Sequence, residues 1–190
     1  MVELKTSLNF ALLHLTTMTK QSLKELIRDV PDFPKDGIVF KDISPLLASA
    51  KARTAMTAAI VSHYKDQTID VVVGIEARGF LFGTLIANAL NASFVMLRKP
   101  GKLPGSIEKF SYDLEYGTDS IEIQKDSIPK GSKVLLHDDV LATGGTAGAA
   151  VKLINSIGGE IIGANFIMEL DFLKGKEQLG ELDVFSVLHY

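Results

Sequence analysis

Short apolar runs alternate with stretches of helical periodicity along most of the chain. The strand-like runs lie at residues 69–75, 93–97, 133–137, 161–168 and 184–188. The stretches with apolar residues on one helical face lie at residues 49–64, 80–90 and 144–157. Strands that alternate with helices predict an α/β fold with an open, mainly parallel, twisted sheet flanked by helices. The nearly unbroken apolar run at 69–75 fits a sheet covered on both faces.

The N-terminal third departs from this alternation. Ser22 to Glu25 has the form of a capping box, in which a hydroxyl and a carboxylate bond to free backbone N–H groups, so a helix is predicted to begin there. Pro31 and Pro34 should end this helix. Residues 32–45 are then expected to form an ordered loop.

The first twenty residues are predicted to be a dispensable arm, with residues 21–190 forming a single domain. The apolar stretch 10–15 is far too short to span a bilayer, which needs ~20 residues. A signal peptide is disfavoured because Lys5 is a weak basic region and no small-residue cleavage site follows. Met18, just before the helix signal, is a candidate natural start.

Composition and charge narrow the class of protein. A chain of 190 residues with 46% hydrophobic content suffices for one α/β domain with a core. The net charge of −3 leaves no surplus of Lys and Arg, which argues against a sequence-independent nucleic-acid binder. The absence of cysteine excludes disulfides, thiol nucleophiles and cysteine-bound zinc, and the four histidines show no zinc spacing.

The strongest chemical signal is the segment 134–146, VLLHDDVLATGGT. Two acids, Asp138 and Asp139, follow an apolar strand, and a loop of threonines and glycines at 143–146 then opens a helix. Backbone N–H groups at such a helix start form an anion site. The acids lie where sugar hydroxyls could donate to them. The segment lacks the GKS or GKT of a Walker loop, and a plain turn would not explain two acids.

Two other predicted strand ends supply cations. Arg78, just after the strand that ends at Ile75, can bind pyrophosphate through a bidentate pair, and Gly79 beside it would let a ligand approach the backbone. A third strand end carries three cations, namely Arg98, Lys99 and Lys102. Ligands of open parallel sheets bind at the carboxyl ends of the strands. Three such segments at one edge favour a polyphosphate site over separate solvated loops.

These segments resemble a known family. The segment 134–146 is similar to the motif with which type I phosphoribosyltransferases bind phosphoribosyl pyrophosphate (PRPP). The segments 32–45 (DFPKDGIVFKDISP) and 112–117 (YDLEYG) are similar to those of the adenine phosphoribosyltransferases. The similarity runs from about residue 22 to the end of the chain. It implies a small N-terminal hood within residues 21–45 and a mobile β-loop over the site.

The resemblance implies a pentosyl-transferring enzyme of purine salvage. Adenine and PRPP would give AMP and pyrophosphate by nucleophilic substitution at ribose C1. Mg²⁺ would be bound mainly through PRPP and pyrophosphate, so no protein ligand is assigned to it. A homodimer in the cytoplasm is implied, with no nucleic-acid or membrane partner.

The resemblance also assigns residues to these ligands. Asp138 and Asp139 would contact the ribose hydroxyls, and the 5′-phosphate would be held by Ala142, Thr143, Gly144, Gly145 and Thr146. Pyrophosphate would be bound by Arg78, Arg98, Lys99 and Lys102. Adenine would be bound by the backbone of Val39, with Phe40 and Lys41 beside it.

The catalytic candidates are Glu115 and Arg78. The segment 111–124 is expected to be extended with a turn at 117–119, and the resemblance places Glu115 there as a general acid or base acting on the purine, with Tyr116 beside it. Lys41 stands where many relatives have Arg, and His137 where an apolar residue is usual. We interpret His137 as a core or half-buried histidine rather than a catalytic one.

Two alternatives stay open at this point. The chain could be another type I transferase that uses guanine, xanthine or orotate, which competition between free bases would reveal. It could instead be a non-catalytic regulator that keeps the PRPP motif and binds DNA. The short arm before residue 21 and the sequence pI near 5.8 argue against the second alternative.

Overall fold

The computed structural model describes residues 18–113 and 118–190. Contacts within the chain group it into two compact units, residues 1–59 and 60–190. Within the described part of the chain, no helix is both long enough and apolar enough to cross a membrane.

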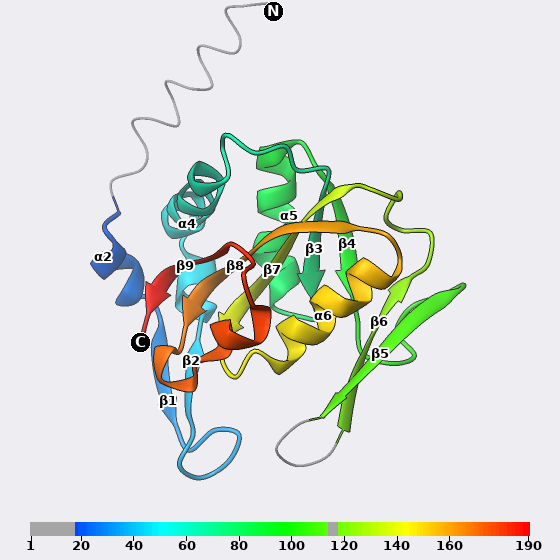
Figure 1. Cartoon of the computed structure of the whole chain (residues 1–190). Helices are drawn as coiled ribbons and strands as arrows, with labels where there is room; N and C mark the ends of the chain where they lie inside the picture. Colours follow the sequence, from blue (N-terminus) through cyan, green and yellow to red (C-terminus); the bar gives the residue numbers. More distant parts are fainter. Residues whose placement is uncertain (1–17, 114–117) are drawn as a thin grey trace, which may run out of the picture. The chain divides into compact units, whose positions relative to one another are not determined.

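The first unit contains a two-stranded antiparallel sheet and short helices (Figure 1). Its elements are α2 (Lys20–Lys24), β1 (Arg28–Pro31), β2 (Val39–Asp42), α3 (Ser44–Ala48) and the start of α4 (Ala50–His63). The predicted capping box at Ser22 is wrong, because Thr19 caps α2 by accepting the Ser22 N–H at 3.1 Å. The predicted loop 32–45 is also partly wrong. Residues 39–42 form β2, which pairs with β1.

The second unit is built on a five-stranded sheet in the order β4-β3-β7-β8-β9. All four neighbouring pairs are parallel, which confirms the predicted fold class. The strands are β3 (Val71–Ile75), β4 (Ser93–Leu97), β7 (Lys133–Leu141), β8 (Glu160–Glu169) and β9 (Val184–His189). All five residues of β3 are buried, as expected for a central strand covered on both faces.

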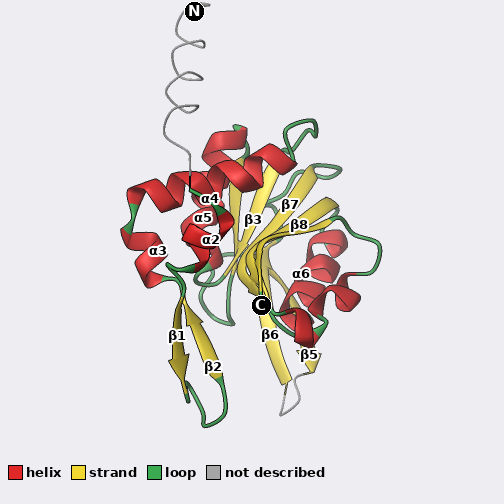
Figure 2. Cartoon of the chain, turned by 90° about the vertical axis from the view of Figure 1, so that its left-hand side faces the viewer, coloured by secondary structure: helices red, strands yellow, loops and turns green. Residues whose placement is uncertain are grey.

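Helices α5 (Gly79–Leu90) and α6 (Gly145–Ser156) lie on opposite sides of this sheet (Figure 2). A separate antiparallel hairpin, β5 (Ile107–Asp113) and β6 (Thr118–Gln124), packs beside α6. Two 3-10 helices, η1 (Asp171–Leu173) and η2 (Gly175–Leu179), follow β8, and η2 also contacts α6. The strand order reverses between β3 and β7. The carboxyl ends of these two strands are therefore where a ligand is expected.

Strand β7 is four residues longer than the strand predicted at 133–137. Asp138 and Asp139 therefore lie inside the strand rather than after it. The reason is the neighbouring strand: β8 also extends, and the register continues from Asp138 opposite Phe166 to Leu141 opposite Glu169. Backbone pairing thus fixes the two acids more rigidly than a loop would.

Candidate functional site

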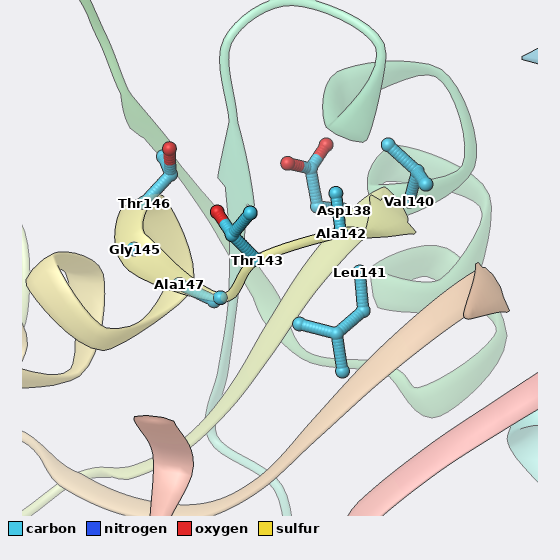
Figure 3. A pocket seen from close by; sticks show the side chains of 9 residues that line it. Asp138, Val140, Leu141, Ala142, Thr143, Gly145, Thr146 and Ala147 are labelled. Carbon is cyan, nitrogen blue, oxygen red and sulfur yellow. The ribbon is translucent and has the colours of Figure 1, made fainter. Parts of the chain in front are cut away.

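The segment that joins β7 to α6 forms a pocket (Figure 3). It is lined by Asp138, Val140, Leu141, Ala142, Thr143, Gly144, Gly145, Thr146 and Ala147. Gly144 has a φ of 82° and immediately precedes α6, whose first N–H groups have no partner within the helix. Figure 3 shows the side chains of Asp138, Thr143 and Thr146 along this segment. The N–H groups at the start of α6 can bind an anion, and the carboxylate of Asp138 lines the same pocket.

The two acids of β7 differ in their surroundings. Asp139 is 2% exposed, and its Oδ2 lies 2.5 Å from Nε of Arg78. Asp138 is half-buried, and its Oδ1 accepts the backbone N–H of Asp139 at 2.8 Å. Burial, together with the neighbouring charge of Asp139, raises the pKa of the Asp138 carboxyl well above its ordinary value. Hydroxyl donors from a sugar would favour its charged form.

Gly79 brings α5 close to these acids. A Cβ at Gly79 would lie 2.9 Å from the carbonyl oxygen of His137 and 3.0 Å from Oδ1 of Asp138. The space beside this glycine is therefore taken by β7. The expectation that Gly79 makes room for a ligand is corrected accordingly: in this structure it allows helix α5 to pack closely against the strand that carries the acids.

His137 is fully buried on β7, in agreement with its interpretation as a core residue. Asn165 of β8 donates its Nδ2 proton to the carbonyl of Leu136 at 2.9 Å, so its Oδ1 is the acceptor for Nδ1 of His137 at 2.7 Å. The proton of the neutral imidazole is thereby placed on Nδ1. Nε2 finds no hydrogen-bond partner among the described residues, so the ring is only half satisfied.

The buried imidazole predicts a loss of stability in acid. Burial lowers the pKa of His137 from 6.5 to about 4. The unfolded chain takes up a proton at higher pH than the folded one, so this contribution to stability is lost as pH falls from about 6.5 towards 4. We expect a loss of about 2 kcal/mol between pH 7 and pH 5. Urea unfolding at both pH values measures it. In the double variant His137→Val with Asn165→Val, the free energy of unfolding should fall less between pH 7 and pH 5 than in the wild-type protein. An equal fall in the variant and the wild type would contradict the prediction.

Glu76 organises the cationic loop that follows β4. Its carboxylate accepts from Nε and Nη2 of Arg98 at 3.2 and 3.1 Å and from the backbone N–H of Lys99 at 2.7 Å. The hydrogen bond from Arg98 lowers the pKa of Glu76, although burial acts in the opposite direction. Arg98 also donates to the carbonyl of Lys102 at 3.2 Å. The sequence gives no sign of this role of Glu76, because the residues that donate hydrogen bonds to it lie more than 20 positions away.

Lys99 is paired with an acid of the hairpin. Its Nζ forms an ion pair with Oδ2 of Asp119 on β6. Oδ2 also accepts the hydroxyl proton of Tyr112 at 3.2 Å. Burial alone would lower the pKa of Lys99 and raise the pKa of Asp119. The hydrogen bond and the charges of the pair outweigh burial, so the pKa of Lys99 is raised and the pKa of Asp119 is lowered. The two side chains are therefore charged at neutral pH. The hydroxyl of Tyr112 lies 3.0 Å from that of Thr146 in the pocket between β7 and α6.

The predicted base-binding residues lie in the first unit. Val39 begins β2 with its side chain 48% exposed. The ring of Phe40 packs edge-on against Phe33, with ring centroids 5.2 Å apart. Nζ of Lys41 bonds to Oδ1 of Asp29 across the hairpin at 2.7 Å. These contacts hold the hairpin together. The catalytic candidate Glu115, with Tyr116, falls in residues 114–117, outside the described part of the chain.

One residue that supports the pocket was missed from the sequence. Gly175, at the start of η2, lies against the loop 142–144 that leads into α6, and a Cβ there would overlap the carbonyl oxygen of Ala142. Likewise, a Cβ at Gly144 would overlap the carbonyl oxygen of Gly175. The two glycines let η2 and the loop touch through their backbones. No local pattern around Gly175 indicates this contact, because its partner is more than thirty residues away in the sequence.

Replacing Gly175 with alanine is expected to displace the loop. Overpacking of this kind costs about 1–3 kcal/mol, so affinity for a ligand held by the loop should fall by about 5- to 150-fold if the displaced loop bears the whole cost. Calorimetric titration with AMP, which carries a 5′-phosphate, measures the effect. The matched control is Gly148→Ala on α6, where a Cβ would come no nearer than 3.3 Å to the carbonyl of Gln178. Equal affinities in the two variants would show that the close contact is unimportant.

Comparison with known proteins shows which family the chain resembles. Residues 41–181 match the phosphoribosyl transferase domain. An adenine phosphoribosyltransferase of Acidobacterium capsulatum is 54% identical over 170 residues, which are 90% of this chain and 94% of that protein.

Solved structures agree. The crystal structure of adenine phosphoribosyltransferase from Thermoanaerobacter pseudethanolicus superposes with a TM-score of 0.89 at 45% identity, over 90% of this chain and all of that one. The structure of the Trypanosoma brucei enzyme in complex with AMP, pyrophosphate and ribose-5-phosphate has a TM-score of 0.82 at 30% identity. It covers 90% of this chain and 79% of that one.

Proposed function

The chain belongs to the phosphoribosyl transferase family, within its adenine phosphoribosyltransferase branch, and we therefore propose that it converts adenine and PRPP to AMP and pyrophosphate in purine salvage. The observation that carries the proposal is the pocket between β7 and α6, where the start of the helix lies in one pocket with Asp138, and Asp139 is the next residue of the strand. A phosphorylated sugar fits this arrangement, because its phosphate would lie at the helix start while its hydroxyls reach the carboxylates. The Trypanosoma brucei relative, crystallised with AMP and pyrophosphate, supports the same assignment.

The proposed roles follow from chemistry. The N–H groups at the start of α6 and the hydroxyls of Thr143 and Thr146 would bind the 5′-phosphate. The carboxylates of β7 would accept protons from the two ribose hydroxyls. Their charge would also favour the positive charge that develops on the ribose as the bond to pyrophosphate breaks. The cations of the site would offset the charge of the leaving group.

Adenine recognition is proposed for the backbone at Val39. An N–H and a C=O side by side complement N1 and the 6-amino group of adenine. Hypoxanthine reverses this pattern of donor and acceptor, and a mismatched polar pair in a closed site costs ~1–3 kcal/mol. Phe40 and Lys41 would lie beside the base. Backbone recognition would be insensitive to the side chain at 41, so the Lys found there is compatible with adenine specificity.

Mg²⁺ is proposed to enter with the pyrophosphate group. The carboxylates around the cationic loops are already engaged: Asp139 with Arg78, Glu76 with Arg98, and Asp119 with Lys99. This leaves ligand oxygens as the main donors, in keeping with the small number of protein ligands that Mg²⁺ often has in phosphate sites. The ion would supply charge neutralisation on the leaving group.

The experiment that tests the proposal is product formation from PRPP and Mg²⁺ with adenine, hypoxanthine, guanine, xanthine and orotate in turn. AMP from adenine, with little or no product from the others, is the expected result. Turnover of a different base would leave the PRPP site intact and overturn the base assignment. Binding of PRPP without turnover of any base would favour a regulatory protein.

The oligomeric state and the cellular location of the enzyme are also predicted. The homodimer and the cytoplasmic location follow from the family resemblance and stay predictions. Sedimentation of the purified chain and fractionation of its host cells would test them separately.

A further inference from the structure

Three of the four cations expected at pyrophosphate are held by carboxylates of the chain itself. The three acids have different duties. Asp139 is one of the two ribose carboxylates, and Glu76 shapes the loop through Arg98 and a backbone N–H. Asp119, which holds Lys99, has no place in the reaction as proposed. The ion pair between Asp119 and Lys99 is therefore the one without an assigned role.

Asp119 is well supplied with donors. Its Oδ1 accepts the backbone N–H of Ser120 at 2.7 Å. Its Oδ2 takes both Nζ of Lys99 and the hydroxyl proton of Tyr112. The carboxylate therefore retains two donors if Lys99 moves away. An acid left with hydrogen bonds can lose its cation at little cost, whereas a stranded acid cannot.

Tyr112 links this acid to the phosphate loop. Its side chain belongs to the core of the second unit and is only 9% exposed, so its hydroxyl is fixed in place. Its single proton goes to Asp119, so the hydroxyl of Thr146 is the donor in the 3.0 Å contact between the two. Nζ of Lys99 is thus held near the loop expected to carry the 5′-phosphate.

We propose that Asp119 is a positioning residue that holds Lys99 before PRPP binds and yields it to the pyrophosphate of PRPP, while Tyr112 and Ser120 keep the carboxylate hydrogen-bonded. The inference rests on the proposed function. The side chains of Lys99 and Asp119 are 42% and 30% exposed, so an incoming anion can reach the pair. Asp119 then competes with the ligand. It orders Lys99 before binding, at the expense of PRPP affinity.

Comparing PRPP with AMP tests this competition. Both ligands carry a ribose 5-phosphate, and only PRPP carries the pyrophosphate that would take Lys99. We expect Asp119→Asn to bind PRPP about two- to fivefold more tightly, because partly exposed ion pairs are worth up to about fivefold in affinity. Its affinity for AMP should stay unchanged. Isothermal titration with Mg²⁺ and no base present measures both.

A double-mutant cycle separates competition from a general effect of charge. The gain from Asp119→Asn should vanish when Lys99 is replaced by Gln, since nothing is then released. The matched control is Glu108→Gln in β5 of the same hairpin, whose carboxylate pairs with Lys125 at 3.1 Å. This control should leave PRPP affinity unchanged. Asp119→Ser provides the same test if the Asn variant does not fold.

The outcomes distinguish this inference from the proposed function. Unchanged PRPP affinity in both Asp119 variants, or the same gain with Lys99→Gln present, would overturn the role of Asp119 and leave the proposed function standing. Wild-type protein that binds neither PRPP nor AMP would overturn both. Tighter PRPP binding that depends on Lys99, with AMP unaffected, is the result that supports it.

Discussion

Replacing Asp138 and Asp139 together by asparagine is expected to lower kcat/KM for PRPP by about 10²- to 10⁴-fold. Each carboxylate is proposed to accept a hydrogen bond from a ribose hydroxyl, and hydrogen bonds to charged groups are worth about 1.5–3 kcal/mol each. Two of them give about 3–6 kcal/mol, which corresponds to that range in rate. Steady-state kinetics with adenine and PRPP provides the measurement.

The direction of this effect is informative. PRPP is a polyanion, so removing two negative charges beside it should strengthen its attraction to the site. A loss of activity therefore reports lost hydrogen bonds and lost stabilisation of positive charge on the ribose. Asp66→Asn with Asp126→Asn is the control, since it removes the same charge from two exposed positions. Normal PRPP binding together with normal rates in the β7 variant would remove both acids from the site.

The parallel sheet could be predicted from the sequence because its strands are short apolar runs between amphipathic helices. The bounds of β4 were predicted to the residue, at 93–97. The end of β7 was not, because Asp138 and Asp139 resemble loop residues locally. They remain in the strand since β8 continues beside them, and this pairing involves residues nearly thirty positions away.

The hairpin of the first unit was missed for a related reason. Three prolines (Pro31, Pro34 and Pro45) and several charged residues lie in the segment 28–45, a composition typical of loops. The strands are held together because pairing brings Lys41 opposite Asp29, while the ring of Phe40 packs on Phe33 just beyond the end of β1. Such cross-strand contacts stabilise a hairpin without leaving a periodic pattern in either strand.

The site itself was predictable in part. Sequence motifs pointed to the two acids, the loop before α6 and the cations, because each group lies at or just beyond the carboxyl end of a strand of the same sheet. The carboxylate partners of the cations could not be found this way. Glu76 and Asp119 lie about twenty residues from Arg98 and Lys99 along the chain, and only folding brings them together. A local motif therefore predicts which charges are present but not which of them are already paired.

The residue proposed for acid–base chemistry gives the second large expected effect. Glu115→Gln should lower kcat by about 10²- to 10⁴-fold, the usual contribution of a positioned acid or base. Glutamine keeps the size and hydrogen-bonding capacity of the side chain but cannot take up or give a proton. PRPP affinity should change little, because the proposed role belongs to the chemical step.

Two measurements on the Glu115→Gln variant separate an effect on the chemical step from an effect on binding. Single-turnover formation of AMP reports the chemical step, and calorimetric titration with PRPP reports binding. Glu108→Gln is the matched control, since it makes the same chemical change at a residue of β5 whose carboxylate pairs with Lys125. If Glu115→Gln weakens PRPP binding as much as it slows turnover, the residue orders the site and is not the acid or base. If turnover is unchanged, the proton must be handled by another group, and adenine N9 would attack without help from the segment between β5 and β6.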